Sequence, residues 1–241
     1  MLDLSIKGTS NCKDWAELPK NVVAATGGVI QETAIVCGGT NFLESFDECY
    51  SLNSNPATLI THMSAKRAYA ASLVIDKTKL WITGGWSSDT GSSLASSEFI
   101  TLEGSEPGPE LPNPILYHAL VAIDNSLYML IGGWNGIVTP ITHYFDHQAH
   151  NWIQGPHLMQ ARMQHAAGVV TDEVTTEKFV IVTGGEDNSS TILDSTEMLI
   201  NSQWNHYYSM DKGVWHVNWP IWLKFTFEGA NFIETQLTTS Y

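Results

Sequence analysis

Histidines are the residues of this sequence whose spacing most invites a chemical role. Nine are present, and three of them, His143, His147 and His150, fall in the stretch HYFDHQAH. Three imidazole nitrogens that converge can hold zinc or copper. The same stretch falls where we expect a turn between two strands, however, and the side chains of a turn splay outward. We therefore expect neither a metal site nor any other cofactor.

Motifs for nucleophilic, metal-dependent or nucleotide chemistry do not occur elsewhere. The sequence contains no GxSxG, HExxH or CxxC, and no GxxxxGK[ST] or GxGxxG follows any of its paired glycines. Each of these patterns marks a particular geometry of nucleophile, ligand or phosphate-binding backbone. We assign no catalytic residue and predict that the protein is not an enzyme.

Three cysteines, Cys12, Cys37 and Cys49, are too few for a scaffold that depends on disulfides. Cys37 and Cys49 fall in successive expected strands, and facing residues of antiparallel neighbours lie ~4.5–5.5 Å apart, a separation that a disulfide can span. A bridge and two buried free thiols both fit the sequence. A bridge would indicate an extracellular setting, whereas an N-terminus without the apolar core of a signal peptide indicates the cytoplasm.

Composition narrows the class of partner. The 241 residues include 11 Lys and Arg against 25 Asp and Glu, a formal net charge of -14. That charge repels phosphate backbones and anionic lipid headgroups, and no stretch reaches the roughly 18–20 apolar residues that span a bilayer. We expect a protein partner, with no nucleic acid and no membrane insertion.

A paired glycine recurs after each of four short apolar runs, which end in AIVCGG, LWITGG, YMLIGG and FVIVTGG. The second glycines are 46, 48 and 52 residues apart, and self-similarity at a period of about 40–50 residues is typical of propeller blades or solenoid repeats. We expect a structural role, because neighbouring backbones come close at such places and a side chain would clash. The eight glycines are Gly38, Gly39, Gly84, Gly85, Gly132, Gly133, Gly184 and Gly185.

Three further strands recur in phase with the paired glycines. A first strand with small residues precedes each pair, and a third strand follows it after a polar loop. A fourth strand ends the repeat, most clearly at Trp152 and Trp204. The third-strand residues expected at one shared place are Glu48, Glu98 and Glu197, with Tyr144 near it in the remaining repeat.

This succession resembles the kelch repeat, in which paired glycines end the second strand, an acidic residue and a tyrosine mark the third, and a tryptophan marks the fourth. The resemblance covers roughly residues 20–205. It implies an all-β, kelch-type β-propeller with four clear four-stranded blades. We place the blades at about 20–60, 61–110, 111–156 and 157–208, after an N-terminal segment 1–19 that is a candidate outer strand.

Four blades fall short of the closed rings that the resemblance implies. Segment 209–241 is strand-like and aromatic but lacks paired glycines, so we expect at most a partial or degenerate fifth blade there. We therefore expect an incomplete ring or a fragment, with open blade edges capable of self-association. The tryptophan of the fourth strand is also missing after Glu48 and after Glu98, which weakens the prediction of those outer strands.

By resemblance the chain is a kelch binding module for protein–protein interaction. No helical segment resembling the BTB and BACK domains of cullin adaptors precedes the repeats, which weakens an adaptor role. The alternative is an oxidase- or epimerase-like kelch enzyme that uses the channel mouth for a small molecule or carbohydrate. A copper radical oxidase needs a tyrosine crosslinked to cysteine, a second tyrosine and paired histidines, and no such set maps onto this chain. No motif assigns it to the epimerases.

Binding in a propeller falls to the loops, since the strands are committed to packing. Trp86 and Trp134 directly follow two paired glycines, where a large apolar side chain beside polar groups is typical of interaction hot spots. Packing of each tryptophan over a neighbouring blade is the alternative, and we favour it. His118 and His165 recur at one place in first strands, which indicates a packing role, with lining of the channel mouth as the alternative. The candidate interaction residues are Trp86, Asp89, Trp134, Asn135, Glu186 and Asp187.

Overall fold

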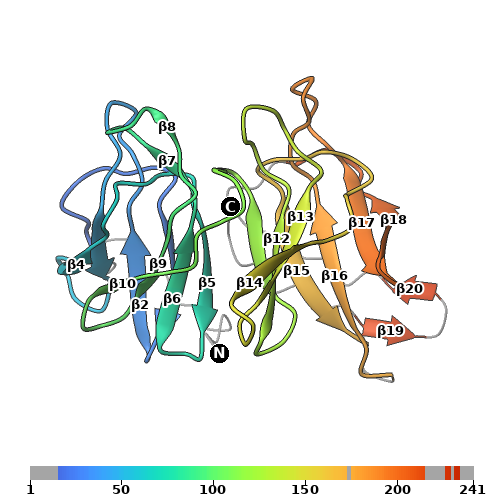
Figure 1. Ribbon diagram of the computed structural model, residues 1–241, viewed down its shortest axis with the longest axis horizontal. Helices are drawn as coiled ribbons and strands as arrows, with labels where there is room; N and C mark the ends of the chain where they lie inside the picture. Colours follow the sequence, from blue (N-terminus) through green and yellow to red (C-terminus); the bar gives the residue numbers. More distant parts are fainter. Residues whose placement is uncertain (1–15, 173–174, 215–225, 229–230, 234–241) are drawn as a thin grey trace, which may run out of the picture.

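The computed structural model describes residues 16–172, 175–214, 226–228 and 231–233. Every regular element within them is a β-strand, and most strands form four separate four-stranded antiparallel sheets (Figure 1). The predicted all-β fold of four four-stranded blades is confirmed. Cys12, with most of the N-terminal segment and most of segment 209–241, lies outside the described residues. Those that are described include no helix long and apolar enough to cross a membrane.

Each blade is a meander whose strands pair in chain order. Blade 1 consists of β1 (Thr26–Ile30), β2 (Thr33–Cys37), β3 (Glu48–Ser51) and β4 (Thr58–His62). Blade 2 consists of β5 (Ala71–Ile75), β6 (Lys79–Thr83), β9 (Ser97–Ile100) and β10 (Ser105–Pro107). Blade 3 consists of β11 (Ala119–Ala122), β12 (Leu127–Ile131), β13 (Thr142–Asp146) and β14 (Asn151–Gln154). Blade 4 consists of β15 (Ala166–Thr171), β16 (Lys178–Thr183), β17 (Ser195–Ile200) and β18 (Gln203–Ser209).

Two short hairpins lie outside the blades. β7 (Trp86–Ser87) pairs with β8 (Ser92–Ser93) in a loop of blade 2, and β19 (Thr226–Glu228) pairs with β20 (Asn231–Ile233). The predicted blade boundary at residue 60 falls inside β4, and β18 runs one residue past the predicted end at 208. The outer strands β4 and β10 form although they lack the tryptophan found in β14 and β18.

The blades stand side by side with their first strands innermost. β1 contacts β5, β5 contacts β11, and β11 contacts β15, so the chain advances by one blade per repeat (Figure 1). Facing side chains form three apolar clusters between successive blades. The core of this fold therefore lies between the sheets.

Trp81 fills the space between blades 2 and 3. Its side chain is fully buried. Four aromatic rings surround it at centroid distances of 5.7, 5.6, 5.3 and 6.0 Å, those of Phe99, Tyr128, Phe145 and Trp152 respectively. Tilted and edge-on pairs at these distances add to the stabilisation that burial provides.

The paired glycines mark where the chain of the next blade crosses. The first glycine of each pair has φ from 56° to 67° and the second from 93° to 102°, a region that favours glycine. A Cβ at Gly84 would lie 2.3 Å from the carbonyl oxygen of Ile115, and one at Gly85 would lie 2.8 Å from that of Ala68. Backbone approach therefore leaves no room for a side chain.

The second glycine of each pair also links successive blades by a hydrogen bond. Its N–H donates to a carbonyl of the segment that enters the next blade. The last of these bonds shows that the chain leaves blade 4 in the register in which it enters blades 2, 3 and 4. The four bonds run from Gly39 to Arg67, Gly85 to Ile115, Gly133 to Arg162 and Gly185 to Val214, at 2.9, 2.8, 2.9 and 2.8 Å.

Replacing Gly84 by alanine should lower the free energy of unfolding by about 2–4 kcal/mol. A left-handed backbone conformation costs an L-residue with a side chain roughly 1–2 kcal/mol. The clash of the added Cβ with the Ile115 carbonyl adds strain of about the same size. Gly91 is the matched control, because its φ is +63° and nothing lies within 4 Å of the position that a Cβ would take there. Urea denaturation of both variants checks this, and equal losses would contradict the crossing role of Gly84.

Candidate functional site

The loops between the second and third strands of the four blades gather at one end of the molecule, where Figure 1 shows β7 and β8. We call this end the loop face, and it comprises residues 40–47, 86–96, 134–141 and 186–194. All six candidate interaction residues lie in these loops. The structure thus brings residues from three blades to one end.

Two of the six candidates are engaged within the loop face. Asp89 pairs with Lys66 at 3.0 Å. Asp187 accepts hydrogen bonds from the N–H groups of Thr191 and Ser189 at 3.0 and 2.8 Å, which lower its pKa. These two carboxylates therefore shape the loops.

The other four candidates present side chains at the surface to differing degrees. Trp134 is 37% exposed and Asn135 is exposed, whereas Trp86 and Glu186 are half-buried. The Glu186 carboxylate forms no ion pair with any residue that the structure describes. Packing over a neighbouring blade, the role that we favour for the tryptophans, therefore covers only part of the Trp134 side chain.

Apolar side chains that sequence reasoning did not select are the most exposed part of the loop face. Phe42 is 78% exposed, Leu43 is 88% exposed and Ile137 is 64% exposed. Ile192 adds a further side chain at 39%. The sequence signal for them was the adjacent Phe-Leu pair within the loop TNFLESFD. Several exposed large apolar side chains at one end of a folded protein favour an interaction surface there.

Hydrogen bonds between loops hold parts of this face together. The N–H of Ser45 donates to Ser88 Oγ at 3.0 Å, and the N–H of Ser88 donates to Ser45 Oγ at 2.9 Å. Val138 and Asn188 form a corresponding pair of bonds at 2.8 and 2.9 Å. The loops of blades 1 and 2, and those of blades 3 and 4, are therefore fixed relative to each other.

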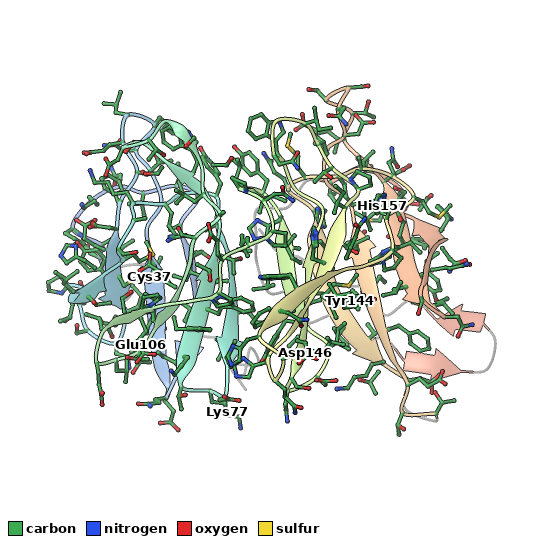
Figure 2. The ribbon with its side chains drawn as sticks, viewed as in Figure 1. Cys37, Lys77, Glu106, Tyr144, Asp146 and His157 are labelled. Atoms are coloured by element: carbon green, nitrogen blue, oxygen red, sulfur yellow. A yellow bond between two sulfur atoms is a disulfide. The ribbon has the colours of Figure 1, made fainter. Side chains whose placement is uncertain are left out.

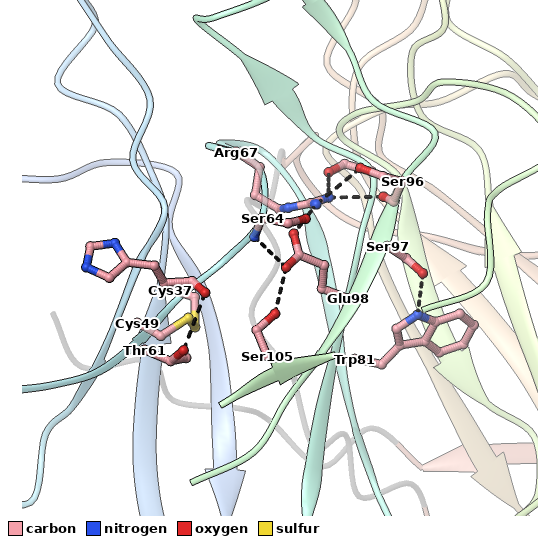
Figure 3. Close-up of polar contacts among 12 residues, drawn as sticks. Cys37, Cys49, Thr61, Ser64, Arg67, Trp81, Ser96, Ser97, Glu98 and Ser105 are labelled. Carbon is pink, nitrogen blue, oxygen red and sulfur yellow. Dashed lines mark hydrogen bonds and ion pairs between the residues drawn. A yellow bond between two sulfur atoms is a disulfide. The ribbon is translucent and has the colours of Figure 1, made fainter. Parts of the chain in front are cut away.

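A buried ion pair between the segment that enters blade 2 and the third strand of that blade was not anticipated from the sequence (Figure 3). Arg67 Nη2 donates to Glu98 Oε1 at 2.6 Å, and its Nη1 donates to the carbonyls of Gly84 and Ser96. Burial alone would raise the pKa of Glu98, but hydrogen bonds from the Ser64 N–H and Ser105 Oγ, with the Arg67 guanidinium, lower it. Both groups are committed to structure.

The same pair recurs in blade 4. Arg162 Nη2 donates to Glu197 Oε1 at 2.7 Å, and Glu197 accepts the N–H groups of Met159 and Gln160. The sequence contains two arginines, Arg67 and Arg162, and both stand at this one place in the repeat. That coincidence is the signal from which the pairs could have been found.

The prediction that Glu48 shares the place of Glu98 is wrong. The N–H of Gly38 donates to the carbonyl of Glu48, whereas the N–H of Gly84 donates to that of Ser96. Glu48 therefore lies two residues before the position that Glu98 occupies. The loops that precede these strands differ in length, so the presence of a glutamate in both strands does not show that the two residues occupy equivalent positions.

Blades 1 and 3 carry other residues where blades 2 and 4 carry the ion pair. Tyr50 stands at the glutamate place in blade 1, and His143, not Tyr144, stands there in blade 3. Val22 and Ile115 take the arginine place. A small pocket remains at each of these two positions. The attachment of the entering segment to the third strand therefore alternates from blade to blade.

His118 and His165 are fully buried between blades, which favours the packing role over lining of a channel mouth. His118 Nε2 forms a 2.8 Å hydrogen bond with Thr83 Oγ1. Ile131 takes the place of Thr83 in the next blade, and neither ring nitrogen of His165 has a hydrogen-bond partner among the described residues. Burial lowers the pKa of each histidine to about 3.

The three histidines of HYFDHQAH are not gathered into one group. The rings of His147 and His150 are 5.5 Å apart in the turn that begins at Asp146, at the end opposite the loop face (Figure 2). His143 lies within β13 and contacts Trp152 edge-on. Within the described parts of the chain, no three His, Cys, Asp or Glu side chains are placed to hold a metal ion.

Cys37 and Cys49 form a disulfide in blade 1 (Figure 3). They are facing residues of β2 and β3, with Cα atoms 4.0 Å apart. In blade 4 the corresponding residues, Thr183 and Thr196, share a hydrogen bond of 2.8 Å. Of the two alternatives that the sequence leaves open, the structure has the bridge.

Comparison with known proteins identifies the fold alone. No protein-family model and no curated protein matches the sequence. The solved structure of YjhT matches with a TM-score of 0.71 and 14% sequence identity, over 84% of this chain and 75% of that chain. The four blades and this likeness define a β-propeller-like protein.

Removing one partner of the buried ion pair should be more damaging than removing both. Arg67→Ile or Glu98→His alone should lower the free energy of unfolding by about 3–5 kcal/mol, because an unpaired charge stays buried. The double variant reproduces the residues of blade 3 and should lose less than either single variant. Denaturant unfolding of all three checks this, with Lys66→Met, which breaks a surface ion pair, as a control. Additive losses would show that the two side chains do not depend on each other.

Stability should fall as the pH drops from about 6.5 towards about 3. The folded protein keeps His118 and His165 neutral, whereas the unfolded chain binds a proton on each below its ordinary pKa of 6.5. Each histidine then contributes about 1.4 kcal/mol per pH unit. Urea midpoints at several pH values should show a shallower slope for His165→Gln than for wild type. An unchanged slope for His165→Gln would refute this assignment.

Proposed function

We propose that the chain is a non-catalytic, kelch-type binding module that holds a protein partner on its loop face. The observation that supports this most is the exposure of Phe42, Leu43 and Ile137 on loops gathered at one end. Exposed large apolar side chains of this kind gain free energy when a partner covers them. Loops on a rigid scaffold are also where binding residues concentrate.

The bonds between loops favour the same proposal. A surface that is already fixed loses less conformational entropy when it binds. The Ser45–Ser88 and Val138–Asn188 bonds fix neighbouring loops without using the exposed apolar side chains. Half-exposed Trp134, beside Asn135, adds the aromatic and polar mixture found at interaction hot spots.

The enzyme alternative has less support. An active site is expected to combine a concave pocket with convergent polar groups of shifted pKa. The strongly shifted buried groups here, His118 and His165, lie between blades, and Glu98 is closed in by Arg67, Ser64 and Ser105. The contacts of these groups favour a packing role.

The test is affinity capture with the full chain from an extract of its source organism, followed by direct binding of each captured protein. Phe42→Ser/Leu43→Ser should weaken binding at least about ten-fold, since two buried side chains contribute more than ~1.4 kcal/mol. Val29→Ser/Leu102→Ser is the matched control, because it removes two exposed apolar side chains beside turns at the other end. Equal affinity of the two double variants would overturn the assignment to the loop face.

A further inference from the structure

The inner rim of the loop face has its own repeating geometry. Each blade contributes two residues to it. One has a left-handed backbone conformation and lies just before the first strand, and the other directly follows the paired glycines. Isolated bridges between neighbouring residues hold the two together in every blade: Val23 with Thr40, Ala68 with Trp86, Leu116 with Trp134, and Met163 with Glu186. We call the eight residues the inner rim: Ala24 and Thr40, Tyr69 and Trp86, Tyr117 and Trp134, Gln164 and Glu186.

Backbone hydrogen bonds join the left-handed residues from blade to blade. The N–H of Tyr69 donates to the carbonyl of Ala24, that of Tyr117 to Tyr69, and that of Gln164 to Tyr117, at 3.0, 3.1 and 3.0 Å. The tyrosine rings of blades 2 and 3 lie 4.7 Å apart at an angle of 53°. The rim is therefore a continuous structure with a defined aromatic pair.

Tyrosine is a costly choice at these positions. Tyr69 and Tyr117 have φ of 60° and 58°, where glycine or asparagine would relieve a strain of about 1–2 kcal/mol. Strained residues that the surroundings hold in place are concentrated at functional sites. The backbone geometry does not call for these rings, so their side chains have another use.

The rim is chemically asymmetric. Blades 2 and 3 provide four aromatic residues, whereas blade 4 provides Gln164 and Glu186. The Gln164 Oε1 atom is buried and accepts no hydrogen bond from a described residue. Burial, together with the neighbouring Tyr69 and the negative charge of Glu186, raises the pKa of Tyr117 to about 12. The negative charge of Glu186 therefore acts on Tyr117, one member of the aromatic pair.

No cationic side chain among the described residues pairs with the Glu186 carboxylate or with Gln164 Oε1. Arg162, in the segment that enters blade 4, is held by Glu197, and Arg67 is held by Glu98. Lys66 pairs with Asp89. Aromatic faces beside a carboxylate and a free amide oxygen are the groups that recognise alkylammonium and guanidinium ions.

We propose that the inner rim binds a cationic side chain, lysine or arginine, of the protein partner. The ring pair Tyr69–Tyr117 and Trp134 would face the apolar stem and the charge, and the half-buried Glu186 carboxylate would accept its N–H groups. This inference rests on the proposed function and names the chemistry of the partner. The apolar loops around the rim would cover the residues that flank the cation.

The test is an NMR titration of the full ¹⁵N-labelled chain with N-acetylarginine methylamide, using N-acetylnorleucine methylamide as the uncharged match. We expect amide shifts at Tyr117, Gln164 and Glu186 with the arginine probe alone. Glu186→Gln should weaken that binding about ten-fold, equivalent to ~1.4 kcal/mol. Asp194→Asn, which removes the same charge from an exposed position of the same loop, should leave it within about two-fold because exposed charges are screened. Equal shifts with both probes, or equal losses in both variants, would overturn the proposal.

Two further measurements are needed. The first tests whether the cation comes from a polypeptide, and the second distinguishes failure of the cation site from failure of the proposed function. A short arginine-containing peptide should bind more tightly than tetramethylammonium chloride, and equal affinity would refute a polypeptide source. Glu186→Gln should also weaken binding of the captured partner. If that partner stays sensitive to Phe42→Ser/Leu43→Ser but not to Glu186→Gln, the cation site fails while the binding function stands.

Discussion

The hydrogen bond from each paired glycine to the next blade is the constraint on which the rest of the structure depends. It requires the entering segment to pass within touching distance of a backbone that has no Cβ. In blade 2 the accepting carbonyl belongs to Arg67, whose side chain then reaches Glu98 in the third strand of its own blade. One residue thus fixes where blade 2 stands against blade 1 and how its third strand is held.

Sequence patterns predicted best the features that recur in every blade. Paired glycines and apolar second strands follow from spacing and residue type, because each depends on contacts that all repeats share. The register of the third strands did not follow. Glu48 and Glu98 are the same residue type in strands of similar sequence, but the loops before these strands have different lengths. Only the hydrogen bonds of Gly38 and Gly84 show that Glu48 lies two residues before the position of Glu98.

The candidate site was predictable as a location and less so in its chemistry. Loops after the second strands must share one end of a meander blade, so the six candidate residues were brought to one face. Exposure of Phe42 and Leu43 depends on which neighbouring segments pack over their loop, and the amino-acid sequence does not reveal that packing. The left-handed conformations of Tyr69 and Tyr117 were also unreadable, since tyrosine gives no signal for positive φ.

A repeated scaffold becomes a specific surface only where its repeats differ. Buried ion pairs hold the segments that enter blades 2 and 4 to the third strands of those blades, whereas aromatic packing around Trp81 holds blade 2 against blade 3. Tyr69 and Tyr117 straddle that aromatic interface, one from each blade. Their separation is therefore set by large apolar groups that pack in one way. The ion pairs, in turn, anchor the segments that lead to Tyr69 and Gln164, so buried differences between the repeats contribute to the asymmetry of the face that the blades present.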